Sequence, residues 1–141
     1  MESPNNIKNW GISIEQEREF WDKSLINILI PVPKNCKYCQ KGIIYLRKKD
    51  SLINPYLGKC NNFKCNREIF LRVGTIFEFQ NKTPASVLYN ILILWLHEEF
   101  NAKKISEKLK EIYSVDTVNN KLIYTFLHLC RILIANYLRT R

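Results

Sequence analysis

Hydrophobic residues follow a helical spacing in the first part of this chain. Between residues 20 and 28 they recur at three- and four-residue steps, which places them on one face of a helix. Ser13, with Gln16 three residues later, has the pattern of a capping box, so we expect the helix to begin just after Ser13. Pro31 and Pro33 lack the amide hydrogen that a helix needs and restrict the residues before them, so the helix should end before residue 30.

The middle of the chain has the pattern of short strands. Segments rich in β-branched and aromatic residues are separated there by a polar stretch and by Gly74. We expect strands over residues 43–47, 56–59, 68–73 and 75–79. Strands this short bury little apolar surface, so the region needs a further stabilising element.

From Pro84 onward the period is helical again. We expect Thr83 to cap a helix with Pro84 in its first turn. Helices are expected over residues 85–99, 102–113 and 117–138. The last of these has a continuous apolar stripe, formed by Val118, Leu122, Phe126, Leu129, Leu133 and Tyr137.

These patterns predict an α+β fold with three domains. An N-terminal helical segment occupies residues 1–33, a ribbon of short antiparallel strands residues 34–82, and a helical domain residues 83–141. At 141 residues, with 46% hydrophobic and 25% charged residues, the chain has the composition of a small globular protein.

The charge is concentrated in the middle domain. The chain has 22 basic and 13 acidic residues, a net charge of +9. Residues 34–82 hold eleven of the basic and three of the acidic residues, a net charge of +8. So large an excess on so small a chain favours a polyanionic partner, and nucleic acid in particular, over a small-molecule substrate.

Four cysteines lie in the same domain. Cys36 and Cys39 form a C-x2-C pair, Cys60 and Cys65 form a C-x4-C pair, and 20 residues separate the two pairs. Two such pairs suit one tetrahedral Zn²⁺, which would replace the core that short strands cannot build. Four thiolates leave no open coordination position, so the zinc would be structural. Disulfides or merely buried cysteines are the alternatives, and Cys130 in the last helix is most simply a core residue.

The location expected from the sequence is intracellular, in the nucleus or cytoplasm. Charged residues interrupt the first thirty positions where a secretory signal would be apolar, and the apolar runs are too short or too polar for a membrane span. An odd number of cysteines also suits a reducing compartment.

Basic residues within the ribbon are candidates for nucleic-acid binding. They lie at the expected hairpin tip and around the second cysteine pair, and they are Arg47, Lys48, Lys49, Lys59, Lys64, Arg67 and Arg72. Aromatic residues among them can stack on bases, and these are Tyr38, Tyr45, Tyr56 and Phe63. The alternative is a solvated face whose aromatic rings pack over the metal site.

The last two expected helices have the form of a helix-turn-helix, joined by a short turn at residues 114–116. In such a unit the first exposed residues of the second helix face a groove of the duplex. Besides Thr117, these would be Asn119, Asn120, Lys121 and Tyr124. A plain packing hairpin of two helices has the same pattern and remains the alternative.

The order of these features resembles the N-terminal half of Merlin-type transposases and their bacterial insertion-sequence relatives over residues 14–138. Its most specific part is the second cysteine pair followed by the stretch from Arg72 through Gly74 to Glu78. The resemblance implies that zinc is bound by the four cysteines and that DNA with terminal inverted repeats is bound by the ribbon and the helix-turn-helix.

The chain also departs from that family. Members continue into a ribonuclease-H-like catalytic domain, whose acidic triad has no counterpart among Asp22, Asp50 and Asp116, so we expect no enzymatic activity. Within the first cysteine pair, Lys37 and Tyr38 replace a frequent proline, and Gln40 replaces the usual glycine after the pair.

Three functions follow as hypotheses. The first is a noncatalytic DNA-binding protein derived from a transposase. The second is a zinc-ribbon protein bound to ribosomal RNA or to the ribosome, since the same positive charges and aromatic rings bind RNA and DNA. The third is a protein-interaction module that dimerises through its last helix.

Overall fold

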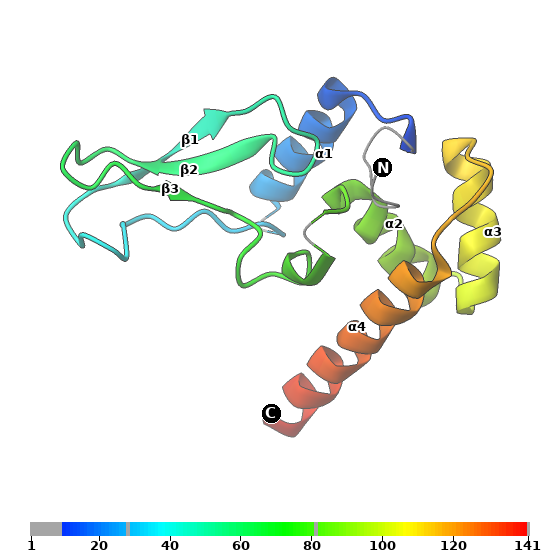
Figure 1. The fold of residues 1–141 in the computed structure, drawn as a ribbon. Coiled ribbons are helices and arrows are strands. Elements are labelled where there is room, and N and C mark those ends of the chain that lie inside the picture. Colours follow the sequence, from blue (N-terminus) through cyan, green and yellow to red (C-terminus); the bar gives the residue numbers. More distant parts are fainter. Residues whose placement is uncertain (1–9, 28, 81, 141) are drawn as a thin grey trace. The chain divides into compact units, whose positions relative to one another are not determined.

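The structure is a computed structural model that describes residues 10–27, 29–80 and 82–140. It confirms the predicted α+β class: an N-terminal helix, a three-stranded antiparallel sheet that bears the four cysteines, and three helices packed together (Figure 1). The chain divides into two compact units. Ser13–Thr75 form the first, here called the ribbon unit, and residues 76–140 with residues 10–12 form the second, the helical unit.

Helix α1, Ile14–Ile26, begins as the sequence predicts. The Gln16 amide donates to the Ser13 hydroxyl oxygen over 3.1 Å, and the Ser13 amide donates to the Gln16 side-chain oxygen over 2.9 Å. This reciprocal capping box satisfies two amide groups that the first helical turn leaves without backbone partners. The helix ends at Ile26, with Asn27 as its C-cap, well before the two prolines.

Three strands form the sheet of the ribbon unit, in the order β1-β2-β3. Strands β1, Ile44–Lys48, and β2, Tyr56–Cys60, pair antiparallel with Ile44 opposite Cys60. Strand β3, Glu68–Ile69, pairs with β2 through Gly58 and Lys59. The sheet therefore brings the end of β2, where Cys60 lies, next to the chain that follows the first cysteine pair.

The prediction of a fourth strand over residues 75–79 is wrong, and the third strand is shorter than predicted. After Ile69 the chain turns, with amide hydrogen bonds from Val73 to Phe70 and from Thr75 to Arg72. Gly74 has a φ of +82°, a left-handed conformation that reverses the backbone instead of extending it. Residues 75–79 form no strand, and a 3₁₀ helix, η2, follows at Glu78–Gln80.

Helix α1 contacts the tip of the β1–β2 hairpin within the ribbon unit. Arg18 Nη2 donates to the Lys49 carbonyl over 2.9 Å and pairs with the Asp50 carboxylate over 3.1 Å. The buried Trp21 indole donates to the Glu17 carboxylate over 3.3 Å, so the buried side of the helix combines apolar and polar contacts. These contacts attach the helix to the sheet that bears the cysteines.

The helical unit contains α2, Ala85–Leu96, α3, Ala102–Tyr113, and α4, Asn120–Thr140. The bounds of α3 agree with the prediction. Helix α2 ends earlier than predicted, because the chain turns through Glu99 at a φ of +56°. The predicted cap at Thr83 is wrong, since Pro84 occupies the N-cap position.

Apolar side chains from all three helices make the core of this unit. Asn101 caps α3 by accepting a hydrogen bond from the Lys104 amide over 2.9 Å. Cys130 on α4 is buried, as predicted. The fully buried apolar residues of the three helices are Ala85, Val87, Leu88, Ile91, Ile105, Leu109, Ile123, Phe126 and Leu127.

Within the described ranges, the helices are too short or too polar to cross a lipid bilayer.

Candidate metal centre

The first cysteine pair lies in a tight turn, here called the first knuckle, over residues 36–42. The Cys36 amide donates to the Gly42 carbonyl over 3.0 Å, and the Gln40 amide donates to the Cys36 carbonyl over 2.9 Å. Gln40 has a φ of +59°, in the left-handed region that favours glycine. Glycine would adopt this conformation without strain, and in this chain the turn forms with glutamine.

The second knuckle, residues 60–67, is built in a similar way. The amides of Cys65 and Asn66 both donate to the Asn62 carbonyl, over 3.0 and 2.8 Å. Asn66 follows its cysteine with a φ of +51°, a conformation that asparagine tolerates better than most residues. The Asn61 side-chain oxygen accepts from the Ile43 amide over 2.9 Å, which ties the second knuckle to the strand that leaves the first.

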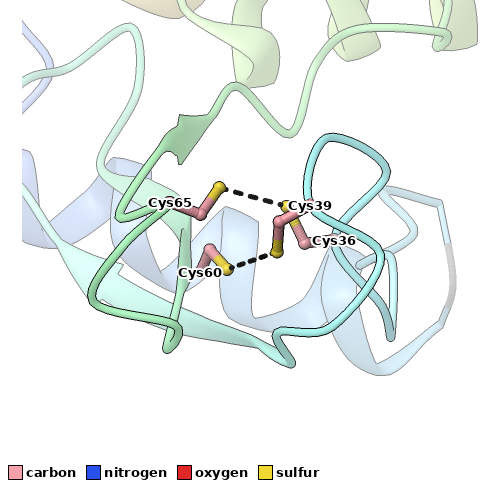
Figure 2. Close-up of side chains that lie close together, drawn as sticks. All are labelled: Cys36, Cys39, Cys60 and Cys65. Atoms are coloured by element: carbon pink, nitrogen blue, oxygen red, sulfur yellow. Dashed lines mark hydrogen bonds between the residues drawn. The ribbon is translucent and has the colours of Figure 1, made fainter.

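The four sulfur atoms converge at one end of the sheet, as Figure 2 shows. All four Sγ atoms lie within 4.8 Å of one another. The Sγ atoms of Cys36 and Cys65 are 3.7 Å apart, and those of Cys39 and Cys60 are 3.6 Å apart. Tetrahedral Zn–S bonds of about 2.3 Å would hold sulfur atoms about 3.8 Å apart, so the donor set fits one zinc ion.

The cysteines are also the core of this part of the molecule. Cys36 and Cys60 are about as buried as Ile44, and Cys39, Cys65 and Ile69 pack against them. All five cysteines of the chain are free thiols, so the disulfide alternative has no counterpart in this structure. The sequence-based prediction of a single four-cysteine cluster is therefore confirmed, as a candidate zinc site.

The environments of the thiols differ. Backbone amides of Lys41 and Gly42 point at the Cys39 sulfur and lower its pKa to about 6, and the Gly42 amide is 3.3 Å from it. Burial raises the pKa of Cys60 to about 12. Binding of Zn²⁺ would therefore have to displace the Cys60 proton, which couples metal affinity to pH.

Gly42 is a site residue that the sequence analysis missed. A Cβ atom at this position would lie 2.1 Å from the Cys60 sulfur, far inside any real contact. Only glycine lets the chain leave the first knuckle while Cys60 enters the cluster. A glycine three residues after the second cysteine of a C-x2-C pair was the available sign in the sequence.

At the hairpin end of the ribbon, two of the three predicted basic residues are paired. Lys49 and Arg47 lie 3.2 and 3.7 Å from the same Glu68 carboxylate. The hydrogen bond from Lys49 holds the pKa of Glu68 below its usual value. Lys48 is exposed beside them. The acidic partner on β3 thus offsets part of the positive charge that the sequence places at this tip.

Arg72, another predicted nucleic-acid contact, is buried, with 3% of its surface exposed. Its Nη1 atom donates to the Ile53 carbonyl over 3.4 Å. Burial lowers the pKa of its guanidinium to about 10, and the charge of Glu17 acts in the opposite sense. The turn after β3 directs this side chain inward, so the structure does not present it to a partner.

The other basic residues of the ribbon that were predicted to contact nucleic acid lie on or near the knuckles. Lys64 and Arg67 are exposed, and Lys59 on β2 is half-buried. The Arg67 guanidinium lies over the Tyr38 ring, 4.4 Å from its centroid, and the Lys37 ammonium is 5.2 Å from the same centroid. Positive charge and an aromatic ring from different knuckles therefore meet at the metal-binding end.

The predicted groove-facing residues belong to the helical unit. Asn119, Asn120, Lys121 and Tyr124 are all exposed at the start of α4. The Asn119 side-chain oxygen accepts from the Lys121 amide over 3.0 Å, so Asn119 caps the helix. This cap explains why α4 begins at Asn120, not at Thr117, and why the connection from α3 is longer than predicted.

Comparison of the chain with protein-family models, with curated proteins and with solved structures finds no match. The four-cysteine sheet is thus identified by its own geometry, and the relation to Merlin-type transposases stays an interpretation of the sequence.

Proposed function

We propose that this chain is a noncatalytic, zinc-dependent nucleic-acid-binding protein that binds duplex DNA, as the N-terminal half of a Merlin-type transposase does. The observation that carries the proposal is the basic surface at the cysteine cluster. Neither knuckle, residues 36–42 or 60–67, contains an acidic residue, and together they contain four basic residues: Lys37, Lys41, Lys64 and Arg67.

The cysteine geometry supports the zinc-dependent part of this proposal. The basic side chains lie on turns whose conformation depends on the convergence of four sulfur atoms. A zinc ion bound there would fix the turns and therefore the spacing of the positive charges.

The start of α4 supports a second contact region. Asn120, Lys121 and Tyr124 offer amide, ammonium and hydroxyl groups on one exposed stretch of helix. Amide side chains can pair with adenine edges, and lysine with guanine or phosphate. In this proposal the ribbon supplies most of the affinity, through phosphates, and α4 supplies contacts to base edges.

A salt titration tests the proposal. The zinc-loaded full chain is mixed with a fluorescein-labelled DNA duplex, and anisotropy is measured between about 50 and 200 mM salt. We expect the logarithm of the association constant to fall linearly with the logarithm of salt concentration, with a slope of about −0.9 per phosphate contact. The double variant Lys64→Gln with Arg67→Gln should make this slope less steep, by the equivalent of about two phosphate contacts.

A matched variant controls for net charge. Lys103→Gln with Arg139→Gln also removes two charges, from exposed positions of the helical unit. An equal loss of affinity in both double variants would show a charge effect without a defined surface and would contradict the proposal. Absence of salt-dependent binding to the duplex would overturn the proposal. Tighter binding to a structured RNA at matched salt would show that RNA, not duplex DNA, is the ligand.

A further inference from the structure

Phe63 stands out at the tip of the second knuckle. Its side chain is 83% exposed, more than any other large hydrophobic side chain in the described ranges. The hydrogen bonds that shape this knuckle come from Asn62, Cys65 and Asn66, so the turn does not depend on the phenyl ring. An aromatic ring that a turn holds in solvent is available to stack on a flat group of a partner.

The first knuckle presents a second aromatic group. Tyr38, between Cys36 and Cys39, is 50% exposed. The Arg67 guanidinium covers its ring at 4.4 Å, so a planar cation and an aromatic ring are held together before any partner binds. Because Arg67 is the last residue of the second knuckle, this contact also brings the end of one knuckle to the other.

Both aromatic residues lie at one end of the ribbon. Each is in the loop between two cysteines, and the four sulfur atoms of those cysteines lie within 4.8 Å (Figure 2). Lys64 follows Phe63 directly, and Lys37 precedes Tyr38. Each exposed ring thus has an adjacent cation of the kind that contacts phosphate.

The combination points to a particular form of nucleic acid. In a duplex the faces of the bases are covered by their neighbours, so an aromatic side chain can stack only on a base that is unpaired or flipped out. Phosphate contacts alone require no aromatic ring. We infer that the knuckle end binds unpaired nucleobases, with Phe63 stacking on one base and the Tyr38–Arg67 pair forming a second platform. This inference rests on the proposed nucleic-acid binding and narrows it: the basic residues of the knuckles contact phosphates of the DNA, and the two aromatic platforms bind bases of that DNA that are unpaired or flipped out of the duplex.

The test uses the zinc-loaded full chain and two labelled strands of equal length. One is oligothymidylate and the other is an abasic strand, which has the same phosphates but no bases. We expect Phe63→Ala to weaken binding of oligothymidylate about 5- to 150-fold, the effect of losing one stacked base, and to leave binding of the abasic strand unchanged. Affinities are measured by anisotropy, and bound zinc is measured for every variant.

Three variants separate stacking from other effects. Phe63→Trp should retain binding because it keeps an aromatic face, whereas Phe63→Leu keeps an apolar side chain and should lose it. Phe70→Ala removes an aromatic side chain that is 53% exposed, from the turn after β3 and outside both knuckles, and should leave binding unchanged.

The outcomes distinguish the inference from the proposed function. If Phe63→Ala binds both strands as the unchanged protein does, base stacking by Phe63 is wrong, while salt-dependent nucleic-acid binding stands. If Phe63→Leu binds oligothymidylate as tightly as the unchanged protein, the contact is hydrophobic and the inference is likewise overturned. If the unchanged protein binds neither strand nor duplex at low salt, both the inference and the proposed function fail.

Discussion

The two units of this chain differ in what fills their interiors. Around the sheet of the ribbon unit, the buried cluster consists of two cysteines and Ile44, and the strands are only five, five and two residues long. The helical unit instead buries leucine, isoleucine and phenylalanine side chains from three helices. The cysteine end of the ribbon unit therefore depends on the chemistry of its thiols, although this unit also buries Trp21, Ile30 and Leu71, whereas the helical unit depends on hydrophobic burial. Treatments that affect only one of these forces should separate the two units.

Removal of the metal is the largest expected effect. Zinc binding to sites of this kind contributes on the order of 10 kcal/mol to folding, so a strong chelator should unfold the sheet and leave the three helices folded. Cys60→Ser should have the same effect, whereas Cys130→Ser should retain one zinc per chain. Bound zinc per chain and circular dichroism are measured for the chelated protein and for both variants. Equal zinc content in the two variants would contradict the assignment of ligands.

A cavity in the helical unit should produce the opposite result. Phe126 is fully buried on α4. Phe126→Ala should lower the free energy of unfolding of this unit by about 3–5 kcal/mol, the usual cost of removing a buried phenyl ring. Thermal unfolding followed by helix circular dichroism checks the loss, and zinc content should not change. If zinc were lost as well, the two units would not be independent in their stabilisation.

Gly42→Ala tests how tightly the cluster is built. Because the added Cβ would lie 2.1 Å from the Cys60 sulfur, that thiol must move, and we expect zinc affinity to fall about 10- to 100-fold. Competition with a chromophoric chelator measures the affinity. Gly74→Ala is the control. A side chain strains the left-handed backbone at Gly74, but no atom lies within 4 Å of the added Cβ. A similar loss of zinc affinity in both variants would mean that general strain, not the contact with Cys60, is responsible.

Gln40→Gly should give the smallest effect, and a favourable one. Gln40 has a left-handed backbone conformation in the first knuckle. For a residue other than glycine, this conformation lowers stability by about 1 kcal/mol. Glycine relieves this cost but gives the unfolded chain more freedom, so we expect a net gain of no more than about 1 kcal/mol in the stability of the ribbon unit. Chelator titration of the variant measures the gain. A loss of stability would indicate that the glutamine side chain makes a contact that outweighs the backbone strain.

The parts of this structure that were predictable from sequence depend on local chemistry. The spacing of the cysteines, the capping box at Ser13 and the bounds of α3 each follow from residues a few positions apart. Errors arose where distant residues decide the outcome. The burial of Arg72 depends on the turn at Gly74 and on contact with Ile53, and a count of charges does not contain that information.

The pairing of Glu68 with Arg47 and Lys49 was not predicted, again because it depends on residues that are distant in the sequence. It requires β3 to lie in the sheet beside β2, across from β1, which holds Arg47 and directly precedes Lys49. The residues of the hairpin tip and of the knuckles are similarly basic in the sequence, and only the fold shows that part of the charge at the tip is offset. Gly42 was missed for a related reason, because its steric partner Cys60 is far away along the chain.

The placement of the ligands has an entropic consequence. Each knuckle closes within a few residues of chain, and the β1–β2 hairpin is the long loop that a metal ion would close by joining Cys39 to Cys60. The entropy of closing a flexible loop grows only with the logarithm of its length, so doubling the loop costs about 0.6 kcal/mol. In terms of loop entropy, the tip of this hairpin can therefore gain residues at little cost as long as Asp50 and Ile53 keep their contacts with Arg18 and Arg72. The two knuckles cannot change length, because their cysteine spacing fixes the positions of the sulfur atoms.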